Sequence, residues 1–240
     1  MDPTLSLREP IAPQLVAKLR HAIVEMTLRP GEALSEKDIA SRFGVSRQPV
    51  REAFIKLSEA GLLQILPNRG TFVVKISVRE VANARFVREA VEVAIARSAA
   101  EMAAPADIAG LERIMAEQRD TAGREDIAGF KLADIAFHRA ISDIVGCDYA
   151  WRIVEGARAQ TDRMRILSLP DATPMGLLVE QHQAILDAIA AGRPEAAEAT
   201  MRRHLREILV ATARLAERHP DLFEDTDLPR HTALIAPSEI

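Results

Sequence analysis

The feature that most restricts the fold of this chain is a series of short amphipathic segments in residues 11–75, three with helical spacing followed by two that resemble strands. Apolar residues at helical intervals predict a first helix over Ile11–Met26. A second helix is expected to begin after the capping residue Ser35 and to end at Phe43. After a glycine turn, a third helix is predicted over Arg47–Ala60, with its apolar residues on one face.

A predicted hairpin follows the third helix. The runs Leu62–Leu66 and Thr71–Lys75 are β-prone and flank the turn residues Pro67–Gly70. Three helices followed by a hairpin are typical of a winged helix-turn-helix. The architecture alone does not establish DNA binding, because some helix-turn-helix folds serve only for protein contacts.

The polar residues at the start of the third helix suit DNA recognition. The first turns of a recognition helix reach base edges, where arginine can bond guanine and glutamine can bond adenine. The hairpin tip carries a cation beside a glycine that permits close approach of the backbone. The residues that this pattern predicts to contact DNA are Ser46, Arg47, Gln48, Arg51, Arg69 and Gly70. The alternative is a solvated basic face.

Charge is distributed unevenly along the chain. The formal net charge is -4, but residues 1–76 carry 11 Lys and Arg against 8 Asp and Glu, whereas the remainder carries 20 against 27. The basic part is therefore the part expected to lie on phosphates. With 240 residues, 48% hydrophobic and 28% charged, the chain has the composition of a globular protein of two domains.

Two further features bear on location and redox chemistry. No apolar run approaches the length of a bilayer-spanning helix, and the N-terminal residues lack the pattern of a secretory signal, so a cytoplasmic protein is expected. The single cysteine, Cys147, excludes an intramolecular disulfide and a cysteine-rich metal knuckle, and its expected role is packing.

Residues 11–75 closely resemble the DNA-binding domain of the GntR family. The resemblance rests on LSEKDIASRFGVSRQPVREAFIKLSEAGLL at residues 34–63 and on PNRGTFV at residues 67–73. It implies a homodimer on a pseudo-palindromic operator of double-stranded DNA. Lys37 would then join the recognition-helix residues at the major groove, and the hairpin tip would enter the minor groove. Ser46 lies where the family varies, as does Gln48, so the base preference is open.

The pattern is entirely helical after a short connection at residues 76–80, which predicts a mainly α protein with a second, all-helical domain. Six helical segments separated by Gly, Pro and Asp fit an antiparallel bundle. They are Val78–Ala103, Asp107–Thr121, Glu125–Val145, Tyr149–Ser168, Thr173–Ala191 and Pro194–Arg218. The predicted domains are a winged helix-turn-helix in residues 1–76 and a six-helix bundle in residues 77–219, followed by a disordered tail in residues 220–240.

Four polar residues interrupt the apolar faces of the bundle helices. Asp134 and His138, four residues apart, share the inward face of the third bundle helix. His182 and His204 replace apolar residues on the fifth and the sixth. Burying a carboxylate and three imidazoles costs several kcal/mol unless they are paired, and one divalent cation would satisfy all four. A hydrogen-bonded cluster, with Asp134 paired to a histidinium, is the open alternative.

Residues 78–218 resemble the ligand-binding domain of the FCD subgroup of the same family. The most specific pieces are DIAFHRAI at residues 134–141 and QHQAILDAI at residues 181–189. The resemblance implies a divalent metal ion, zinc before nickel, manganese or iron, with remaining positions open to water or to the carboxylate of an effector. The residues that match the metal ligands of the subgroup are Asp134, His138, His182 and His204.

The stretch FVREAVE at residues 86–92 resembles the first-helix pattern of that subgroup and nominates Arg88 as a clamp for the effector carboxylate. A surface or interhelical salt bridge is the alternative for Arg88. Arg163 and Arg165 are further candidates for the pocket, and the sequence leaves open which of them turns inward. Asp148 departs from the family, which often has asparagine there.

These observations predict a transcription regulator, a repressor that binds DNA through its N-terminal domain and a metal with a small carboxylate through the other. The main alternative is a metal-dependent enzyme with an accessory DNA-binding domain. It would need a general base near the metal-bound water, and no Asp or Glu recurs at a suitable spacing, so no catalytic residue is predicted. An architectural DNA-binding protein would not require the buried Asp and His residues.

Overall fold

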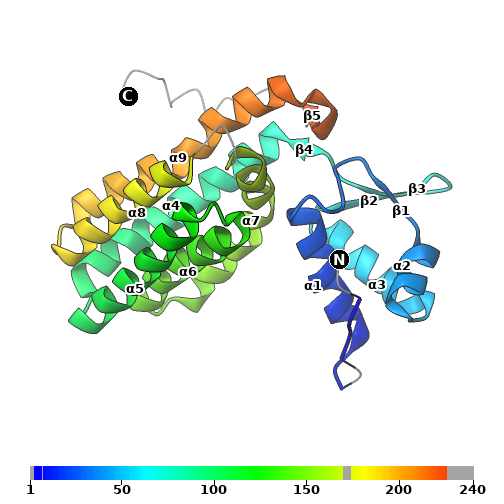
Figure 1. The fold of residues 1–240 in the computed structure, drawn as a ribbon, viewed down its shortest axis with the longest axis horizontal. Helices are drawn as coiled ribbons and strands as arrows, with labels where there is room; N and C mark the ends of the chain where they lie inside the picture. Colours follow the sequence, from blue (N-terminus) through cyan, green and yellow to red (C-terminus); the bar gives the residue numbers. More distant parts are fainter. Residues whose placement is uncertain (1–2, 7, 170–173, 226–240) are drawn as a thin grey trace. The chain divides into compact units, whose positions relative to one another are not determined.

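The computed structural model describes residues 3–6, 8–169 and 174–225, and its contacts divide the chain into two compact units. The N-terminal unit contains the described residues up to Ser77 and also those of 219–226, and the helical unit contains Val78–Arg218. A winged helix-turn-helix and a helical bundle are both present, which confirms the predicted mainly α fold (Figure 1).

Three helices form the body of the N-terminal unit, namely α1 (Ile11–Val24), α2 (Glu36–Phe43) and α3 (Arg47–Glu59). Helix α3 packs against both α1 and α2, as the helical spacing of their apolar residues requires. The residues of α1 and α3 that form the centre of this core, each at most 1% exposed, are Leu15, Leu19, Ile23, Val50, Ala53, Phe54 and Leu57.

Local capping residues mark both ends of α2, but not the start of α3. The Ser35 side chain accepts a hydrogen bond from the backbone N–H of Asp38 at 3.3 Å, so the predicted cap of α2 is confirmed. Gly44 ends α2 with a φ of 65°, which is the left-handed conformation that glycine adopts without steric cost. Ser46 lies at the N-cap of α3, where a serine often caps a helix, but its side chain makes no capping hydrogen bond.

The wing is a hairpin of β2 (Leu63–Leu66) and β3 (Gly70–Val73), paired antiparallel with Leu66 opposite Gly70. Asn68 in the intervening loop has a φ of 59°, a conformation that asparagine tolerates better than most residues. A third strand that the sequence did not predict, β1 (Ala33–Leu34), pairs with the other edge of β3. Two residues are too few to show a strand periodicity.

The segment after the last helix differs from the predicted disordered tail. Pro220–Leu222 form a 3-10 helix, and β5 (Phe223–Asp225) pairs in parallel with β4 (Ile76–Ser77). Leu222 and Phe223 are each 5% exposed, so burial of apolar surface stabilises this segment within the N-terminal unit. The rest of the predicted tail, residues 226–240, lies outside the described residues.

The described part of the helical unit contains six helices that run alongside one another (Figure 1). They are α4 (Val78–Met102), α5 (Pro105–Gly123), α6 (Ile127–Val145), α7 (Asp148–Ser168), α8 (Met175–Ala190) and α9 (Pro194–Arg218). Helix α4 is central, because it packs against α6, α7, α8 and α9. In the described ranges, no helix combines the length and the apolar character that crossing a membrane requires.

The turn between α6 and α7 contains Cys147 and Asp148, for which the sequence led to specific expectations. Cys147 is exposed, so the expectation that it packs in the interior is wrong. Asp148, the residue that departs from the family, is the first residue of α7, and its carboxylate lies 3.5 Å from the Arg139 guanidinium. Neither residue approaches the four predicted metal ligands closely enough to share a hydrogen bond with them in the described structure.

Candidate metal centre and nucleic-acid interface

Three helices of the bundle bring the four predicted metal ligands together. Asp134 and His138 lie one turn apart on α6, so both side chains face the bundle interior. His182 on α8 and His204 on α9 meet them there, and all four side chains are buried. One ligand atom from each residue lies within 4.8 Å of all the others.

The Nε2 atoms of the three histidines converge on one point. Nε2 of His204 lies 3.2 Å from Nε2 of His182 and 3.2 Å from Nε2 of His138. Asp134 Oδ1 lies 3.7 Å from His182 Nε2 and has no hydrogen-bond partner among the described residues. Two nitrogens that are each about 2.1 Å from one zinc ion lie about 3.0–3.4 Å apart for angles between 90° and tetrahedral. The spacing therefore fits ligands of a single metal ion.

The opposite ring nitrogen of each histidine meets an oxygen acceptor. Two of these contacts are hydrogen bonds, His182 Nδ1 with Gln118 Oε1 at 2.7 Å and His204 Nδ1 with Gln181 Oε1 at 3.0 Å. The third is a close contact of His138 Nδ1 with Glu92 Oε2 at 2.5 Å that lacks hydrogen-bond geometry. An acceptor at Nδ1 keeps the proton on that nitrogen and leaves a lone pair on Nε2. This is the tautomer of a metal-ligating histidine, whose other nitrogen donates to a protein oxygen.

A second contact orients each of the two glutamine amides. Gln118 Nε2 donates to the carbonyl oxygen of Ala133 at 3.2 Å, and Gln181 Nε2 lies 3.5 Å from a carboxylate oxygen of Glu207. Because each amide nitrogen faces an acceptor, each amide oxygen is left to face its histidine. The tautomers assigned to His182 and His204 follow from this arrangement.

A hydrogen-bonded cluster without a metal explains less of the geometry. A protonated His138 could donate to Glu92 and to Nε2 of His204, which accounts for one of the two short Nε2 contacts. The contact between His182 and His204 would still bring two lone pairs to 3.2 Å. Burial lowers the pKa of His182 to about 3, so a second histidinium does not form near neutral pH. The four residues fit a divalent cation better than the ion-pair alternative.

The electrostatics of the cluster favour the protonation states that bind metal ions. Burial, and next the proximity of His182, hold the pKa of His204 well below its ordinary value of 6.5. Burial alone would raise the pKa of Asp134, but nearby His138, Arg165 and Arg158 outweigh it and hold this pKa well below 3.8. Neutral imidazole and ionised carboxylate are the forms that ligate a metal.

Buried arginines lie beside the four ligands. Arg158 on α7 donates from Nη2 to Asp134 Oδ2 at 3.1 Å. Arg88 on α4 donates from Nε to Glu92 Oε1 at 2.6 Å and from Nη1 to Thr161 Oγ1 at 3.2 Å. Arg88 is therefore inside the bundle rather than in a surface salt bridge, but two of its donors already have protein partners.

Three buried arginines near the four ligands, Arg88, Arg158 and Arg165, each have a buried N–H donor with no acceptor among the described residues. The donors are Arg88 Nη2, Arg158 Nη1 and Arg165 Nη1. Arg165 belongs to the same group, because its charge lowers the pKa of Asp134. Arg163 is also buried, and burial lowers its pKa to about 10. Buried donors without acceptors are costly, which favours a bound anion at this place.

Acid should destabilise the helical unit. Because burial lowers the pKa of His182 to about 3 from 6.5, the unfolded chain takes up its proton first as pH falls. The stability from this histidine is therefore complete above pH 6.5 and is lost progressively toward pH 3, by at most about 1.4 kcal/mol per pH unit. Urea unfolding of chelator-treated protein, followed by the fluorescence of Trp151, measures this loss.

Two variants make that measurement specific. His182→Gln should flatten the decline of unfolding free energy between pH 6.5 and lower values, because the buried imidazole is gone. His21→Gln changes a largely exposed histidine of α1 and should leave the decline as it is in the parent. Equal slopes for the parent and His182→Gln would show that His182 is not a buried neutral base.

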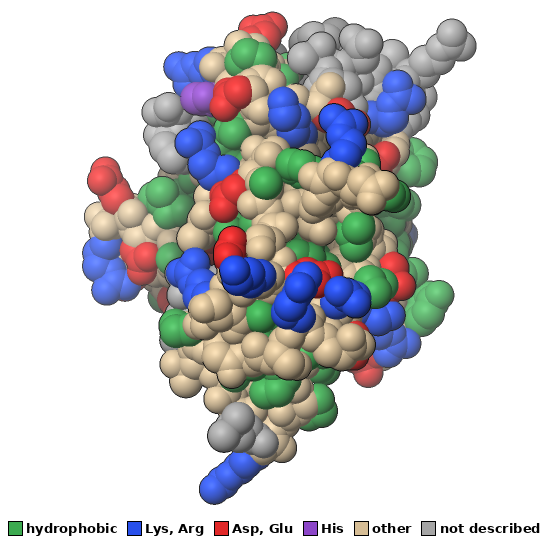
Figure 2. Space-filling view, turned by 90° about the vertical axis from the view of Figure 1, so that its right-hand side faces the viewer, with side chains coloured by type: hydrophobic (Ala, Val, Ile, Leu, Met, Phe, Trp, Pro, Cys, Tyr) green, Lys and Arg blue, Asp and Glu red, His purple; other side chains and the backbone are tan. Residues whose placement is uncertain are grey.

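The predicted DNA-contacting residues lie on the surface of the N-terminal unit. Those near the starts of α2 and α3 are all exposed, namely Lys37, Ser46, Arg47, Gln48 and Arg51. Arg69 and Gly70 are exposed at the end of the hairpin. Figure 2 shows Lys and Arg side chains in a row across one face, with Asp and Glu among them. The basic surface is therefore interrupted by acidic groups.

One acidic residue of this surface contacts two of the predicted DNA-binding arginines. Arg51 donates from Nε and Nη2 to the two carboxylate oxygens of Glu36, each at 3.0 Å, and Arg47 Nη2 donates to the same carboxylate at 3.0 Å. The hydrogen bond from Arg51 is the main cause that lowers the pKa of Glu36. Gln48 donates to Glu52 at 3.0 Å. Glu36 was not among the residues predicted from the sequence to have a role.

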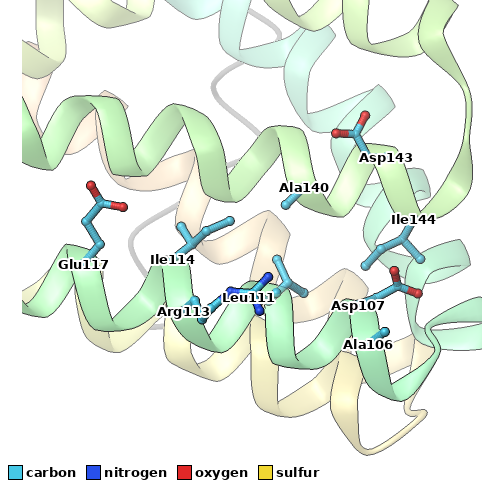
Figure 3. A pocket seen from close by; sticks show the side chains of 10 residues that line it. Ala106, Asp107, Leu111, Arg113, Ile114, Glu117, Ala140, Asp143 and Ile144 are labelled. Carbon is cyan, nitrogen blue, oxygen red and sulfur yellow. The ribbon is translucent and has the colours of Figure 1, made fainter.

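A separate cavity of about 470 Å³ lies between α5 and α6 (Figure 3). Its polar lining consists of Asp107, Arg113, Glu117 and Asp143, beside apolar groups such as Ile114. None of the four predicted metal ligands lines it. This cavity is therefore distinct from the candidate metal centre.

Several side chains that contact the four predicted ligands were not identified from the sequence, namely Glu92, Gln118, Arg158 and Gln181. For two of them, a pattern in the sequence could have identified them. Gln118 continues the apolar stripe of Leu111 and Met115 on α5, where a polar residue is unexpected. Glu92 lies one helical turn after Arg88, so both share a face of α4.

A winged helix-turn-helix joined to a helical unit with a buried polar centre defines a two-domain DNA-binding regulator. The gntR family of bacterial regulatory proteins matches residues 11–73, and the FCD domain matches residues 84–207. The chain belongs to the GntR family, and its helical unit is an FCD domain.

Named relatives agree with this classification. The chain is 38% identical to the HTH-type transcriptional repressor RspR of Escherichia coli (strain K12), over 94% of this chain and 99% of the relative. It is 26% identical to the HTH-type transcriptional regulator LutR of Bacillus subtilis (strain 168), over 74% and 90%. A solved GntR-type regulator from Rhodococcus sp. RHA1 is 28% identical, with a TM-score of 0.70 over 82% of this chain and 95% of that one. The predicted role as a DNA-binding transcription regulator rather than an enzyme is confirmed.

Proposed function

We propose that this chain is a metal-containing repressor that binds a pseudo-palindromic operator as a homodimer and changes its operator affinity when a small carboxylate enters the helical unit. The observation that carries the metal and effector part is the convergence of three Nε2 atoms whose rings each meet an oxygen at Nδ1. The relative RspR is named a transcriptional repressor, which supports repression rather than activation.

The metal would be held by the four residues that converge in the bundle, Asp134, His138, His182 and His204. Three nitrogens and one carboxylate suit zinc, and nickel, manganese and iron are the alternatives. When bound, such an ion supplies a positive charge with open positions for water or a carboxylate. The oxygens of Gln118, Gln181 and Glu92 would keep the imidazole rings aligned for it.

The effector would bind beside the metal ligands, where buried guanidinium donors lack acceptors. Arg88 offers only part of its fork, because Glu92 and Thr161 already accept from Nε and Nη1. The donors available to a carboxylate are then Nη2 of Arg88, Nη1 of Arg158 and Nη1 of Arg165. A small organic acid would satisfy these donors and accept charge-assisted hydrogen bonds from them.

Helix α4 is the element through which the effector would act. It begins at Val78, directly after strand β4 of the N-terminal unit, and it carries Arg88 and Glu92. The half-sites of a palindrome require a fixed spacing between the two winged domains of a dimer. The carboxylate can switch this spacing only by binding one conformation of the dimer better than the other.

Arg88→Ala should retain operator binding and metal content and lose the response to the carboxylate. The active acid is first identified as the member of a panel of small carboxylates that raises the melting temperature of the metal-loaded protein. Gel shifts on DNA from upstream of the gene, with and without that acid, then measure the response. A variant that responds at the parent's effector concentration would remove Arg88 from the mechanism.

Two controls separate ligand binding from folding in this experiment. Arg88→Met keeps the length of the buried side chain without its charge and should also lose the response. Arg97→Ala removes a partly exposed arginine of the same helix and should respond like the parent. Parent protein that binds no DNA, or that turns over a carboxylate instead, would overturn the proposed function itself.

A further inference from the structure

Glu36 links the two helices of the helix-turn-helix. It is the first residue of α2, beside the cap residue Ser35, where the helix dipole stabilises a carboxylate. The Glu36 side chain is 20% exposed, whereas those of Arg47 and Arg51 are 63% and 55% exposed. The carboxylate is thus less accessible to solvent than the two cations that it binds.

The hydrogen bonds of Glu36 restrict both arginines. The two oxygens of Glu36 accept separately from Nε and Nη2 of Arg51, which is the bidentate geometry that fixes the plane of a guanidinium. Arg47, one helical turn earlier on α3, donates to the same carboxylate. Two long side chains that would otherwise sample many rotamers are therefore held in defined positions.

The same carboxylate reduces the positive charge of this surface. Glu36, Arg47 and Arg51 together carry one positive charge rather than the two of the arginines alone. Non-specific binding to DNA depends on the number of phosphates that the protein neutralises, and so it weakens when a cation is compensated. Reading a base edge depends on the alignment of the guanidinium fork, which the ion pair improves.

We infer that Glu36 is a specificity-determining residue, which aligns Arg47 and Arg51 toward base edges and weakens their attraction to phosphates. The winged unit thereby favours its operator over other DNA. Glu36 is a positioning residue, because it acts through the two arginines. The inference rests on the proposed function, in which Arg47 and Arg51 contact the operator.

The test compares the parent and Glu36→Gln on two duplexes. One duplex is selected by the parent protein from a randomised library, and the other has the same length and composition in scrambled order. We expect the ratio of the two affinities to fall about tenfold, the size of one bidentate base contact. Affinity for the scrambled duplex should rise, and its salt dependence should steepen by about one phosphate contact. Glu36→Asp, which keeps the charge, should retain part of the discrimination.

Glu59→Gln is the matched control, because it removes a carboxylate that pairs with Lys56 at the other end of α3. It changes the net charge equally and should leave the affinity ratio as in the parent. A merely structural role of Glu36 would lower the melting temperature without changing the ratio. If Glu36→Gln has the same ratio of affinities for the two duplexes as the parent, this inference alone is overturned. If the parent protein selects no sequence from the library, the proposed function is overturned as well.

Discussion

His204→Ala should lower the affinity of the helical unit for its metal ion by more than about 100-fold, because even the loss of a group that only orients a ligand typically costs 10–100-fold. Nε2 of His204 lies 3.2 Å from Nε2 of both His138 and His182, so this imidazole is central to the cluster. Its removal also deprives Gln181 of its partner at Nδ1. Metal analysis after dialysis and competition with a chelator measure the affinity.

Graded variants show whether the four residues act as ligands. His182→Ala and Asp134→Asn should each approach the loss seen in His204→Ala, whereas Gln118→Leu should lose less, about 10–100-fold. Metal should raise the melting temperature of the parent and of His21→Ala, but not that of His204→Ala. Metal affinity like that of the parent in all three ligand variants would identify the cluster as a hydrogen-bond network.

Arg51→Ala and Arg47→Ala should each weaken operator binding by about 1–3 kcal/mol, which is about 5-fold to 150-fold, while the fold stays intact. Both side chains are more than half exposed and lie at the start of α3, away from its core face. Because both donate to Glu36, their effects should not be additive. Fluorescence anisotropy at fixed salt measures the affinity for the selected duplex.

The other end of the recognition helix supplies the control for this measurement. Lys56→Ala removes a cation of α3 that pairs with Glu59, and it should change operator affinity little. Arg69→Ala at the wing should weaken operator and scrambled duplexes more evenly than the helix variants do. Operator affinity equal to that of the parent in both Arg47→Ala and Arg51→Ala would contradict the proposed recognition surface.

The positions of the helices followed from local patterns. Each bundle helix carries a stripe of apolar residues at a spacing of 3.6, and Gly, Pro or Asp separates it from the next, so the predicted ends differ little from the observed ones. Strands β1 (Ala33–Leu34), β4 (Ile76–Ser77) and β5 (Phe223–Asp225) were missed. Each contains at most three residues and exists because a distant strand pairs with it, which no local pattern reports.

The sequence was also sufficient to predict that the side chains of the four proposed ligands face the bundle interior. Asp134 and His138 replace apolar residues on the apolar face of one helix, and His182 and His204 each do so on the apolar face of another. The periodicity of the apolar residues was therefore enough to predict that all four side chains face the interior. Burial of all four confirms that direction. Binding of a metal there stays a prediction until metal content is measured.

Only the tertiary structure decided what surrounds these side chains. His182 and Gln118 are 64 residues apart, and their contact depends on the packing of α5 against α8. The same holds for Glu36 and Arg51, which meet because α2 and α3 cross. Spacing along a helix determines which face a residue occupies, but hydrogen bonds and charge pairs act over a few ångströms. Their partners are therefore set by how the helices pack, which the periodicity of one helix does not contain.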